Sequence, residues 1–382
     1  MRFWPQMLRL AILAGLCMYT AANIGRLLRV NVVRLQFGWL SLILGSLLFQ
    51  SQVDRPQALY VAYYVFWIVV FWAVLCMVDR GYLTTKQVAL VGTLMNLIMS
   101  ARLLVFIASG VWIGRAQASV GPKDRITDQG YVLLWFTLMQ LLEPVGFIGK
   151  AVAVTSMVAV VLTLERGSLI SLLVGLLIYS AIQAYLVPRQ RKRIAILSSS
   201  SLIAISFAIW MSADRIAVRW LDLSNSKTAG SGRLSFWSSI TTAWMNSDLV
   251  TKIFGFGPLS VQNEVGTFVV FAHNDFLEQL HCFGILGVLF YVAICVAMLI
   301  EGFRLVKSRS NMASVFCAAA AVFISTGLYL SEVCSTDMVW FAIVAGTALA
   351  SARFRERKVV RSMPRFRIPF STVARPAQRL AG

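Results

Sequence analysis

Charged residues are scarce in this chain. They make up 13% of its 382 residues, whereas a soluble domain carries about 25%. Hydrophobic residues make up 58%, so the deficit indicates a protein that is solvated by lipid and not by water. This is not the composition of a soluble enzyme or of a soluble binding domain.

Metal-binding motifs and a cleavable leader are also missing. The two histidines and six cysteines form no CxxC pair and no zinc-type spacing, so we expect no metal site and no bound cofactor. No short apolar stretch ends in a small-residue cleavage site, so no removable signal peptide is expected. A disulfide between Cys282 and Cys334 is a less favoured alternative, which would need an oxidising compartment.

Acidic residues are few, with 16 of them against 35 lysines and arginines and a formal net charge of +19. Such a charge is also found in nucleic-acid-binding proteins. Here, however, each basic cluster flanks an apolar run, and this positive-inside pattern predicts that the clusters are cytoplasmic. The last cluster lies in a predicted basic cytoplasmic tail, residues 353–382, which can also contact anionic headgroups. The clusters are Arg26–Arg34, Arg189–Arg193, Arg304–Arg309 and Arg353–Arg379.

Long apolar runs are present along the whole chain. A helix of about 20 apolar residues crosses the hydrocarbon core, and the run from Ala58 to Val78 contains no charge. Strands are excluded because a barrel would alternate every second residue and an open sheet would leave backbone groups unpaired in lipid. We therefore predict an all-α polytopic membrane protein, one integral membrane domain over residues 1–382 with about 10–12 transmembrane helices. The predicted spans are Met7–Ile24, Phe37–Phe49, Ala58–Val78, Val88–Ile113, Tyr131–Ile148, Ala151–Leu164, Gly167–Val187, Ile194–Met211, Gly284–Ile300, Met312–Leu330 and Met338–Ala350.

One hydrophilic stretch is long, residues 212–283. Tracing the orientation back from the tail places it on the non-cytoplasmic side. It contains five basic and six acidic residues, so it is nearly neutral, unlike the protein as a whole. Loops of this length without a function are uncommon, and topology does not account for its arginines.

Two short helices are predicted in this loop. The first, Arg233–Met245, is amphipathic and suited to a membrane interface, and we expect the run Gly255–Pro258 to end it. The second is expected to start near His273. The apolar face of the first consists of Leu234, Trp237, Ile240 and Trp244, and that of the second of Phe276, Leu277 and Leu280.

Three motifs, in this order along the chain, resemble those of the bacterial O-antigen ligase and polymerase superfamily. Glu165–Ser168 resembles its Ser-Arg-Gly motif, with glutamate where serine is usual. Gly232–Trp237 and Phe254–Pro258 resemble its arginine helix and glycine turn. Ala272–Tyr291 resembles its signature, in which a His-Asn pair, spaced leucines and a Gly-x-x-Gly pair lead into a membrane helix. The resemblance covers residues 150–300 well and the N-terminal third only in hydropathy.

The resemblance implies a GT-C-like helical fold and a glycosyltransferase, which we expect to be metal-independent because arginines can bind the diphosphate in place of a metal ion. Such an enzyme moves or polymerises a glycan from an undecaprenyl-diphosphate donor onto an acceptor glycan or lipid A core, at the periplasmic face of the bacterial inner membrane. It does not separate an O-antigen ligase from an O-antigen or exopolysaccharide polymerase. The alternative is a multi-pass transporter or flippase for a polysaccharide precursor, but such proteins often show internal repeats, and none is found. A membrane scaffold or sensor would not need the residues discussed next.

Four residues are candidates for the chemistry. A sugar hydroxyl needs a general base, and neutral imidazole suits this role near pH 7, so His273 is the predicted base. Guanidinium groups bind diphosphate bidentately and replace a metal ion, so Arg166 and Arg233 are the predicted diphosphate contacts. Arg102 interrupts an apolar run, where ionisable groups are costly and usually functional, and it is the third predicted contact.

Each candidate has a structural alternative. These are a polar residue at a helix start for His273, an interfacial anchor for Arg233, a pair with Glu165 for Arg166 and a pair with Glu143 for Arg102. A metal ion would need carboxylates, but Asp275 and Glu278, the only nearby pair, can also be solvated. His281, two helical turns after His273, is expected to be a structural residue at the membrane surface.

Overall fold

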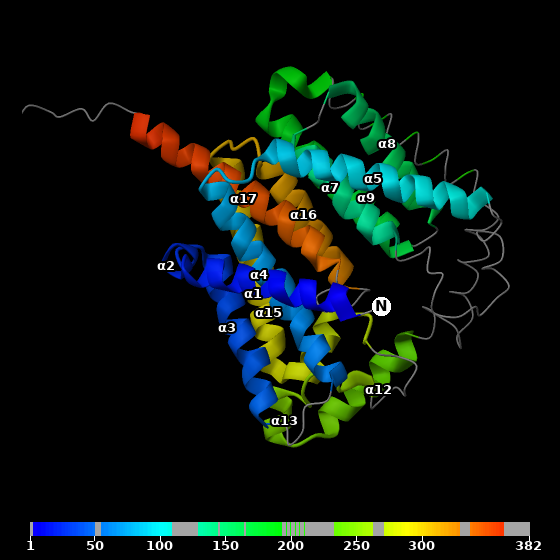
Figure 1. Cartoon of the computed structure of the whole chain (residues 1–382). Helices are drawn as coiled ribbons and strands as arrows, with labels where there is room; N and C mark the ends of the chain where they lie inside the picture. Colours follow the sequence, from blue (N-terminus) through cyan, green and yellow to red (C-terminus); the bar gives the residue numbers. More distant parts are fainter. Residues whose placement is uncertain are drawn as a thin grey trace, which may run out of the picture.

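The structure, a computed structural model, describes residues 3–49, 55–108, 129–143, 146–163, 166–192, 196, 199, 203, 206, 210, 233–262, 271–328 and 337–362. All the elements formed by these residues are helices (Figure 1). They are α1 (Phe3–Ala21), α2 (Ile24–Leu27), α3 (Asn31–Ser46), η1 (Leu47–Phe49), α4 (Arg55–Asp79), α5 (Thr85–Ala108), α7 (Gln129–Leu142), α8 (Gly146–Leu162), α9 (Arg166–Leu186), η2 (Pro188–Gln190), α12 (Arg233–Asn246), α13 (Leu249–Phe254), α15 (Asp275–Lys307), α16 (Ala313–Gly327) and α17 (Met338–Ser362).

Each predicted span that the structure describes overlaps a helix, but the bounds differ. Helix α8 begins at Gly146, inside the predicted span Tyr131–Ile148, and α15 begins nine residues before the predicted Gly284. Four described helices are long and apolar enough to cross a membrane, namely Pro56–Asp79, Thr85–Val105, Gly167–Leu186 and Asp275–Lys307. Shorter apolar helices accompany them in α1, α7, α8, α16 and α17. The predicted span Ile194–Met211 lies outside the described residues apart from single positions. The all-α, polytopic membrane class is therefore confirmed, whereas the number of spans stays a prediction.

Helix α5 shows how the bundle is solvated. Its polar residues Thr93, Asn96 and Ser100 are buried, whereas Leu94 and Ile98 are 52% and 59% exposed. A surface helix of a soluble protein shows the opposite arrangement, with its apolar stripe against the core. Polar side chains inside a bundle and apolar side chains outside it are expected when the surroundings are lipid.

Antiparallel packing determines which helix ends lie together. Ser171 of α9 lies 3.1 Å from Ser325 of α16 between hydroxyl oxygens, and Ser314 of α16 donates to Gln183 of α9 at 2.9 Å. The start of α9 therefore lies beside the end of α16. We call this end of the bundle the loop end, because the predicted loop returns to it through Asn274, whose side chain donates to the carbonyl of Leu328 directly after α16.

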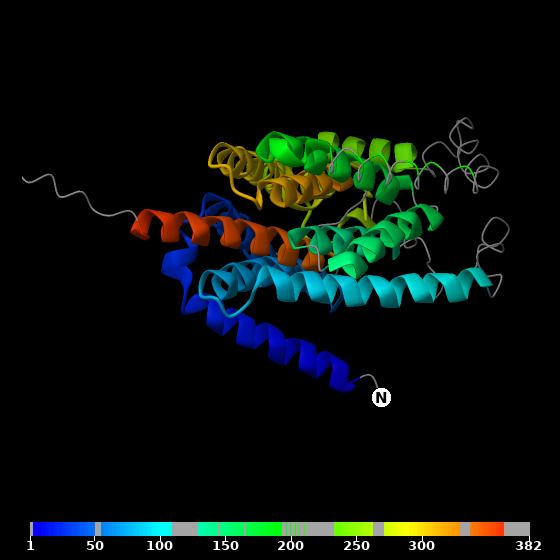
Figure 2. The same ribbon diagram turned by 90° about the horizontal axis from the view of Figure 1, so that it is seen from above.

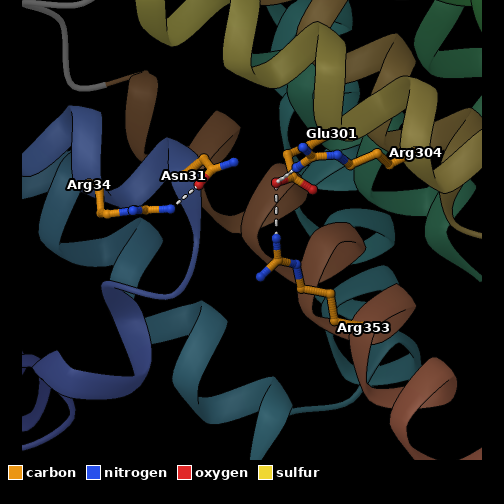
Figure 3. Close-up of polar contacts among 5 residues, drawn as sticks. All are labelled: Asn31, Arg34, Glu301, Arg304 and Arg353. Atoms are coloured by element: carbon orange, nitrogen blue, oxygen red, sulfur yellow. Dashed lines mark hydrogen bonds and ion pairs between the residues drawn. The ribbon is translucent and has the colours of Figure 1, made fainter. Parts of the chain in front are cut away.

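The opposite end of the bundle collects basic residues, and we call it the basic end. Arg80, directly after α4, donates to Asn23 and lies over the ring of Tyr19, 5.8 Å from its centroid. Near the end of α15, Glu301 accepts hydrogen bonds from both Arg304 and Arg353 at 3.0 Å (Figure 3). Figure 2 shows the C-terminal end of α17 (red) and the blue segment after α1 together at this end. The grouping agrees with the predicted positive-inside arrangement.

The Glu301 cluster connects the predicted tail to the membrane helices. Helix α17 continues to Ser362, so the first ten residues of the predicted tail, 353–362, extend a helix. The carboxylate of Glu301 is only 5% exposed, and Arg353 reaches it from α17. The ion pair therefore holds the start of the tail against α15.

Replacing Arg353 by glutamine should lower the thermal midpoint of the purified protein in detergent by a few degrees. A hydrogen bond to a charged group contributes about 1.5–3 kcal/mol, and Arg304 remains as a partner for Glu301. The matched control is Lys307→Gln, which removes an exposed charge from the next turn of α15. Equal midpoints for the two variants would contradict the proposed link.

Candidate functional site

The described part of the predicted loop, residues 233–262 and 271–283, contains a helix that the sequence did not indicate. Helix α12, Arg233–Asn246, confirms the predicted amphipathic helix. The glycine run does not end it, however, because α12 stops at Asn246 and a separate helix α13 follows. Asp248 caps α13 by accepting from the backbone N–H of Thr251 at 3.0 Å, which also lowers the pKa of this exposed carboxyl. The glycine run ends α13 instead.

The two tryptophans of α12 attach it to neighbouring backbone. Trp237 donates its indole N–H to the carbonyl of Ala272 at 2.8 Å, and Trp244 donates to the carbonyl of Lys252 at 3.3 Å. Ile240 between them is fully buried, whereas Leu234 is 58% exposed. The predicted apolar face therefore packs largely against the protein itself.

The glycine run, Gly255–Pro258, packs against a kink in α15. At Gly284 the backbone has φ 64° and ψ −161°, which interrupts the helical hydrogen bonds. The carbonyls of His281 and Cys282 accept instead from the N–H groups of Phe256 at 2.8 Å and of Gly257 at 2.9 Å. The turn after α13 thus supplies the donors that the kink removes.

Glycine is required on both sides of this contact. Gly255 has φ 81°, and a Cβ there would overlap the backbone between Cys282 and Phe283. A Cβ on Gly284 would overlap the carbonyl of Ile253. The two backbones can approach this closely only because neither glycine has a side chain.

His281 lies at the same junction. Its side chain is fully buried, and its ring stacks on Phe256 with centroids 4.5 Å apart and an interplanar angle of 25°. It is a packing residue, as expected, but its position differs from the predicted one. It lies inside the protein because the glycine run covers it, and not at the membrane surface.

His273 lies immediately before α15, as predicted. Asn274 is the N-cap, and its side chain accepts from the backbone N–H of Leu277 at 3.0 Å. His273 itself is half-buried and has φ 52°, a left-handed conformation that is uncommon for residues other than glycine. Its placement therefore depends on the contacts of the residues on either side.

The expectation that Asp275 and Glu278 can be solvated is wrong, because both are fully buried. Asp275 accepts from the hydroxyl of Tyr291 at 3.0 Å. Glu278 accepts from the hydroxyl of Tyr60 at 2.7 Å and from the backbone N–H of Ala272 at 2.6 Å. The polar side of this helix faces the protein interior.

The predicted apolar face of the same helix is less buried than its polar face. Phe276, Leu277 and Leu280 are all partly exposed. Trp39 of α3 and Tyr60 and Tyr64 of α4 provide hydrogen-bond partners for the polar face, and this reverses the orientation that the leucines suggested.

Sequence analysis missed the partners of this buried polar group. Gln279 accepts from the indole of Trp39 at 3.1 Å and donates to the hydroxyl of Tyr64 at 2.8 Å. Tyr60 and Tyr64 lie 3.1 Å apart between hydroxyl oxygens. The available signal was the group of polar residues Asp275, Glu278 and Gln279 directly before an apolar run, since buried polar groups need hydrogen-bond partners.

One hydrogen bond links the helix that carries Arg233 to the segment that carries His273. Arg233 is the first residue of α12 and lies one helical turn before Trp237, on the same side of the helix. The indole of Trp237 binds the carbonyl of Ala272, and His273 is the next residue. The start of α12 is therefore attached to the backbone directly before His273.

Arg166 starts α9, and its side chain lies outside the described part of the chain. The position of its helix is nevertheless informative. Ser171 of α9 contacts Ser325 of α16, and Asn274 contacts the carbonyl of Leu328 just beyond α16. The helix start at Arg166 and the segment at His273 thus lie at the same end of the bundle, beside the end of α16.

The comparison with protein families agrees with this arrangement. Residues 151–292 match the family described as O-antigen ligase. The chain carries an O-antigen ligase domain. The predicted membership of this superfamily is confirmed, and the domain contains Arg166, Arg233 and His273. The family match supports a membrane-embedded enzyme of the O-antigen ligase and polymerase type. No curated protein matches the chain.

Arg102 lies outside the O-antigen ligase domain. Its side chain is exposed, one and two helical turns beyond Ile98 and Leu94 on the outer side of α5. The alternative pair with Glu143 is wrong, because Glu143 accepts from Thr85 at 2.6 Å. Thr85 is 17 residues from Arg102, which is about 26 Å along the helix. Glu165 and Cys334 lie outside the described residues, so their predicted pairings stay predictions.

A groove of about 410 Å³ lies between α3 and the α13 turn, next to the O-antigen ligase domain's glycine run. None of the described residues that line it is ionisable, so these residues contribute no acid, base or phosphate ligand. They are Ser41, Leu42, Gly45, Ser46, Val250, Thr251, Phe254, Gly255, Phe256 and Gly257.

The junction predicts unequal effects of two alanine substitutions. Gly255 and Gly81 have φ of 81° and 79°, a backbone that costs other residues on the order of 1–3 kcal/mol. Only at Gly255 would the new Cβ overlap backbone, since Gly81 has nothing within 4 Å. Gly255→Ala should therefore lower the thermal midpoint and the yield of folded protein clearly more than Gly81→Ala. Similar losses would mean that the close approach is not required.

Proposed function

We propose that this protein is a membrane glycosyltransferase that uses an undecaprenyl-diphosphate-linked glycan. It transfers or polymerises the glycan onto an acceptor hydroxyl at the periplasmic face of the bacterial inner membrane. The observation that supports this best is that the His273 segment, the start of α12 at Arg233 and the start of α9 all lie at the loop end. The O-antigen ligase domain spans all three.

In the proposed orientation the basic end faces the cytoplasm and residues 212–283 form the periplasmic loop. Lysine and arginine accumulate on the cytoplasmic side of membrane proteins, and Arg80 and the Glu301 cluster lie at the end opposite to the site. We further propose that the helices form a GT-C-like fold in a single membrane domain, with residues 353–382 as the cytoplasmic tail.

His273 is the proposed general base. The acceptor hydroxyl attacks the anomeric carbon while the imidazole takes its proton, and the polyprenyl diphosphate leaves. A half-buried histidine remains accessible to a substrate and still has protein around it to orient the ring. Its position directly before the cap of α15 provides a rigid support for this role.

Arg233 and Arg166 are the proposed diphosphate ligands. The leaving group carries negative charge that two guanidinium groups can bind bidentately. Both residues are the first of their helices, where the positive end of the helix dipole adds to the attraction of an anion. This charge would make a divalent metal ion unnecessary.

Arg102 has the most peripheral position of the proposed set. Because its side chain is exposed on the outer side of α5, it would meet a lipid-borne diphosphate only from the lipid side. An interfacial anchor would have the same location. The acceptor, either a growing glycan or lipid A core, would approach from the periplasm, and the polymerase and ligase reactions share this chemistry.

His273→Ala, Arg233→Ala and Arg166→Ala should each abolish complementation of a deletion strain, scored by its polysaccharide profile at matched expression. Loss of a general base typically lowers a rate by about 10²–10⁴-fold, and an unbound diphosphate would raise the donor KM. A smaller effect is expected for Arg102→Ala.

The control is Arg189→Ala, an exposed arginine at the start of η2, near the end of α9 that lies opposite to the site. It should leave the profile unchanged. Wild-type profiles from all three site variants would exclude the proposed chemistry. Movement of a lipid-linked precursor across liposomes by purified protein, without glycan transfer, would favour the transporter or flippase alternative.

Removal of divalent metal should not affect the reaction. In membranes that contain the lipid-linked donor and an acceptor, we expect the same initial rate of transfer with and without EDTA, because the arginines take the place of the metal. A rate that falls with EDTA and recovers with added magnesium or manganese would contradict the proposed arginine role.

A further inference from the structure

We propose that Glu278 and Trp237 are positioning residues that hold the peptide of Ala272 from both sides and so place His273. This inference rests on the proposed function of His273 as the base. Neither residue needs to touch substrate for this role, because each acts through the backbone directly before the histidine.

The contacts form a clamp around a single residue. The carboxylate of Glu278 accepts the backbone N–H of Ala272 at 2.6 Å. The indole of Trp237 donates to the carbonyl of the same residue at 2.8 Å. Ala272 is itself fully buried, so both of its backbone groups are satisfied by side chains and neither depends on solvent.

One side of the clamp is anchored in the membrane helices. Glu278 is fully buried on α15, and its second oxygen accepts from Tyr60 of α4 at 2.7 Å. Tyr60 contacts Tyr64, which accepts from Gln279. A buried carboxylate with several donors cannot move without losing them, and leaving such a group unsatisfied is costly. The contacts of Glu278 therefore fix the position of Ala272 relative to α4 and α15.

The other side of the clamp leads to the proposed donor site. Trp237 lies on α12, one turn after Arg233, and the same face continues to the buried Ile240. A displacement of α12 would consequently move Arg233 and the Ala272 carbonyl together. The clamp couples the arginine that would bind the diphosphate to the histidine that would act on the acceptor.

His273 needs such support because its own backbone is strained. It has φ 52°, and both of its neighbours are fixed by hydrogen bonds. The backbone of Ala272 is held by the clamp, and the side chain of Asn274 donates to the carbonyl of Leu328 directly after α16. A general base must lie within about 3 Å of the proton that it takes. An error of about 1 Å can lower a rate by roughly 100-fold, so loosening the clamp should affect kcat.

The matched pair Trp237→Phe and Trp244→Phe tests this idea. Each variant keeps an aromatic ring on α12 and removes one indole hydrogen bond to a backbone carbonyl, but only Trp237 binds the residue next to His273. With purified protein, lipid-linked donor and acceptor, we expect Trp237→Phe to lower kcat about tenfold with the donor KM changed by less than about twofold. Trp244→Phe should retain the wild-type kcat.

Substitutions at Glu278 provide a second and independent measurement. Glu278→Gln keeps one oxygen for the Ala272 N–H, and its amide group can donate to Tyr60, so it should retain most of the activity. Glu278→Leu removes both contacts and should lower kcat strongly. Thermal midpoints are measured for every variant, and kcat values are compared only among variants that melt within a few degrees of the wild type.

The outcomes separate the two proposals. Equal kcat for Trp237→Phe and Trp244→Phe, while His273→Ala is inactive, would overturn the clamp and leave the proposed function intact. Wild-type activity of His273→Ala would overturn the proposed function itself. If Trp237→Phe melts early, equal activity of folded Glu278→Gln and Glu278→Leu would overturn the clamp instead.

Discussion

Close contact between two backbones joins the long loop to helix α15, and the rest of the site depends on it. Gly255 and Gly284 both lack the side chain that would keep the segments apart. The kink leaves the carbonyls of His281 and Cys282 without helical donors, and the turn after α13 supplies replacements. Because the two features complement each other, α12 and α13 are held against the part of α15 that follows His273.

Lipid surroundings explain why the polar groups lie where they do. In a soluble protein Asp275, Glu278 and Gln279 would be expected at the surface, but here they face the interior, where Trp39, Tyr60, Tyr64 and Tyr291 are their partners. The bundle therefore presents leucines and isoleucines outward along α5 and α15 and keeps tyrosine, tryptophan and carboxylate groups inside. The buried polar contacts connect α3, α4 and α15, and one of them fixes the backbone directly before His273.

The two ends of the molecule differ in a way that serves the proposed reaction. At the basic end, Glu301 forms ion pairs with Arg304 and Arg353. At the loop end, by contrast, the first residues of α9 and α12 and the segment before α15 come together, and these are positions where an anion is attracted. In the proposed reaction, a lipid-linked donor would meet its arginines at the membrane boundary, next to the histidine proposed as the base.

Much of this protein could be predicted from its sequence. Apolar run length and the absence of alternation determine the helical membrane class, because lipid offers no hydrogen bonds to the backbone. Local signals also sufficed for the helix that starts at Arg233 and for the start of α15 at the His-Asn pair, because caps and helical spacing act within a few residues. Motif order was enough to identify the superfamily and to single out His273 and Arg233.

Only the tertiary structure decided which faces are buried and which distant groups meet. The pairing of Arg102 with Glu143 failed because the two lie near opposite ends of α5, and no local pattern records helix direction. The leucines after His273 suggested the wrong inner face, since the partners of Glu278 and Gln279 come from Trp39, Tyr60 and Tyr64, more than two hundred residues earlier in the chain. Sequence periodicity reports the shape of one helix, whereas burial depends on what the neighbouring helices offer, and that information exists only in the folded bundle.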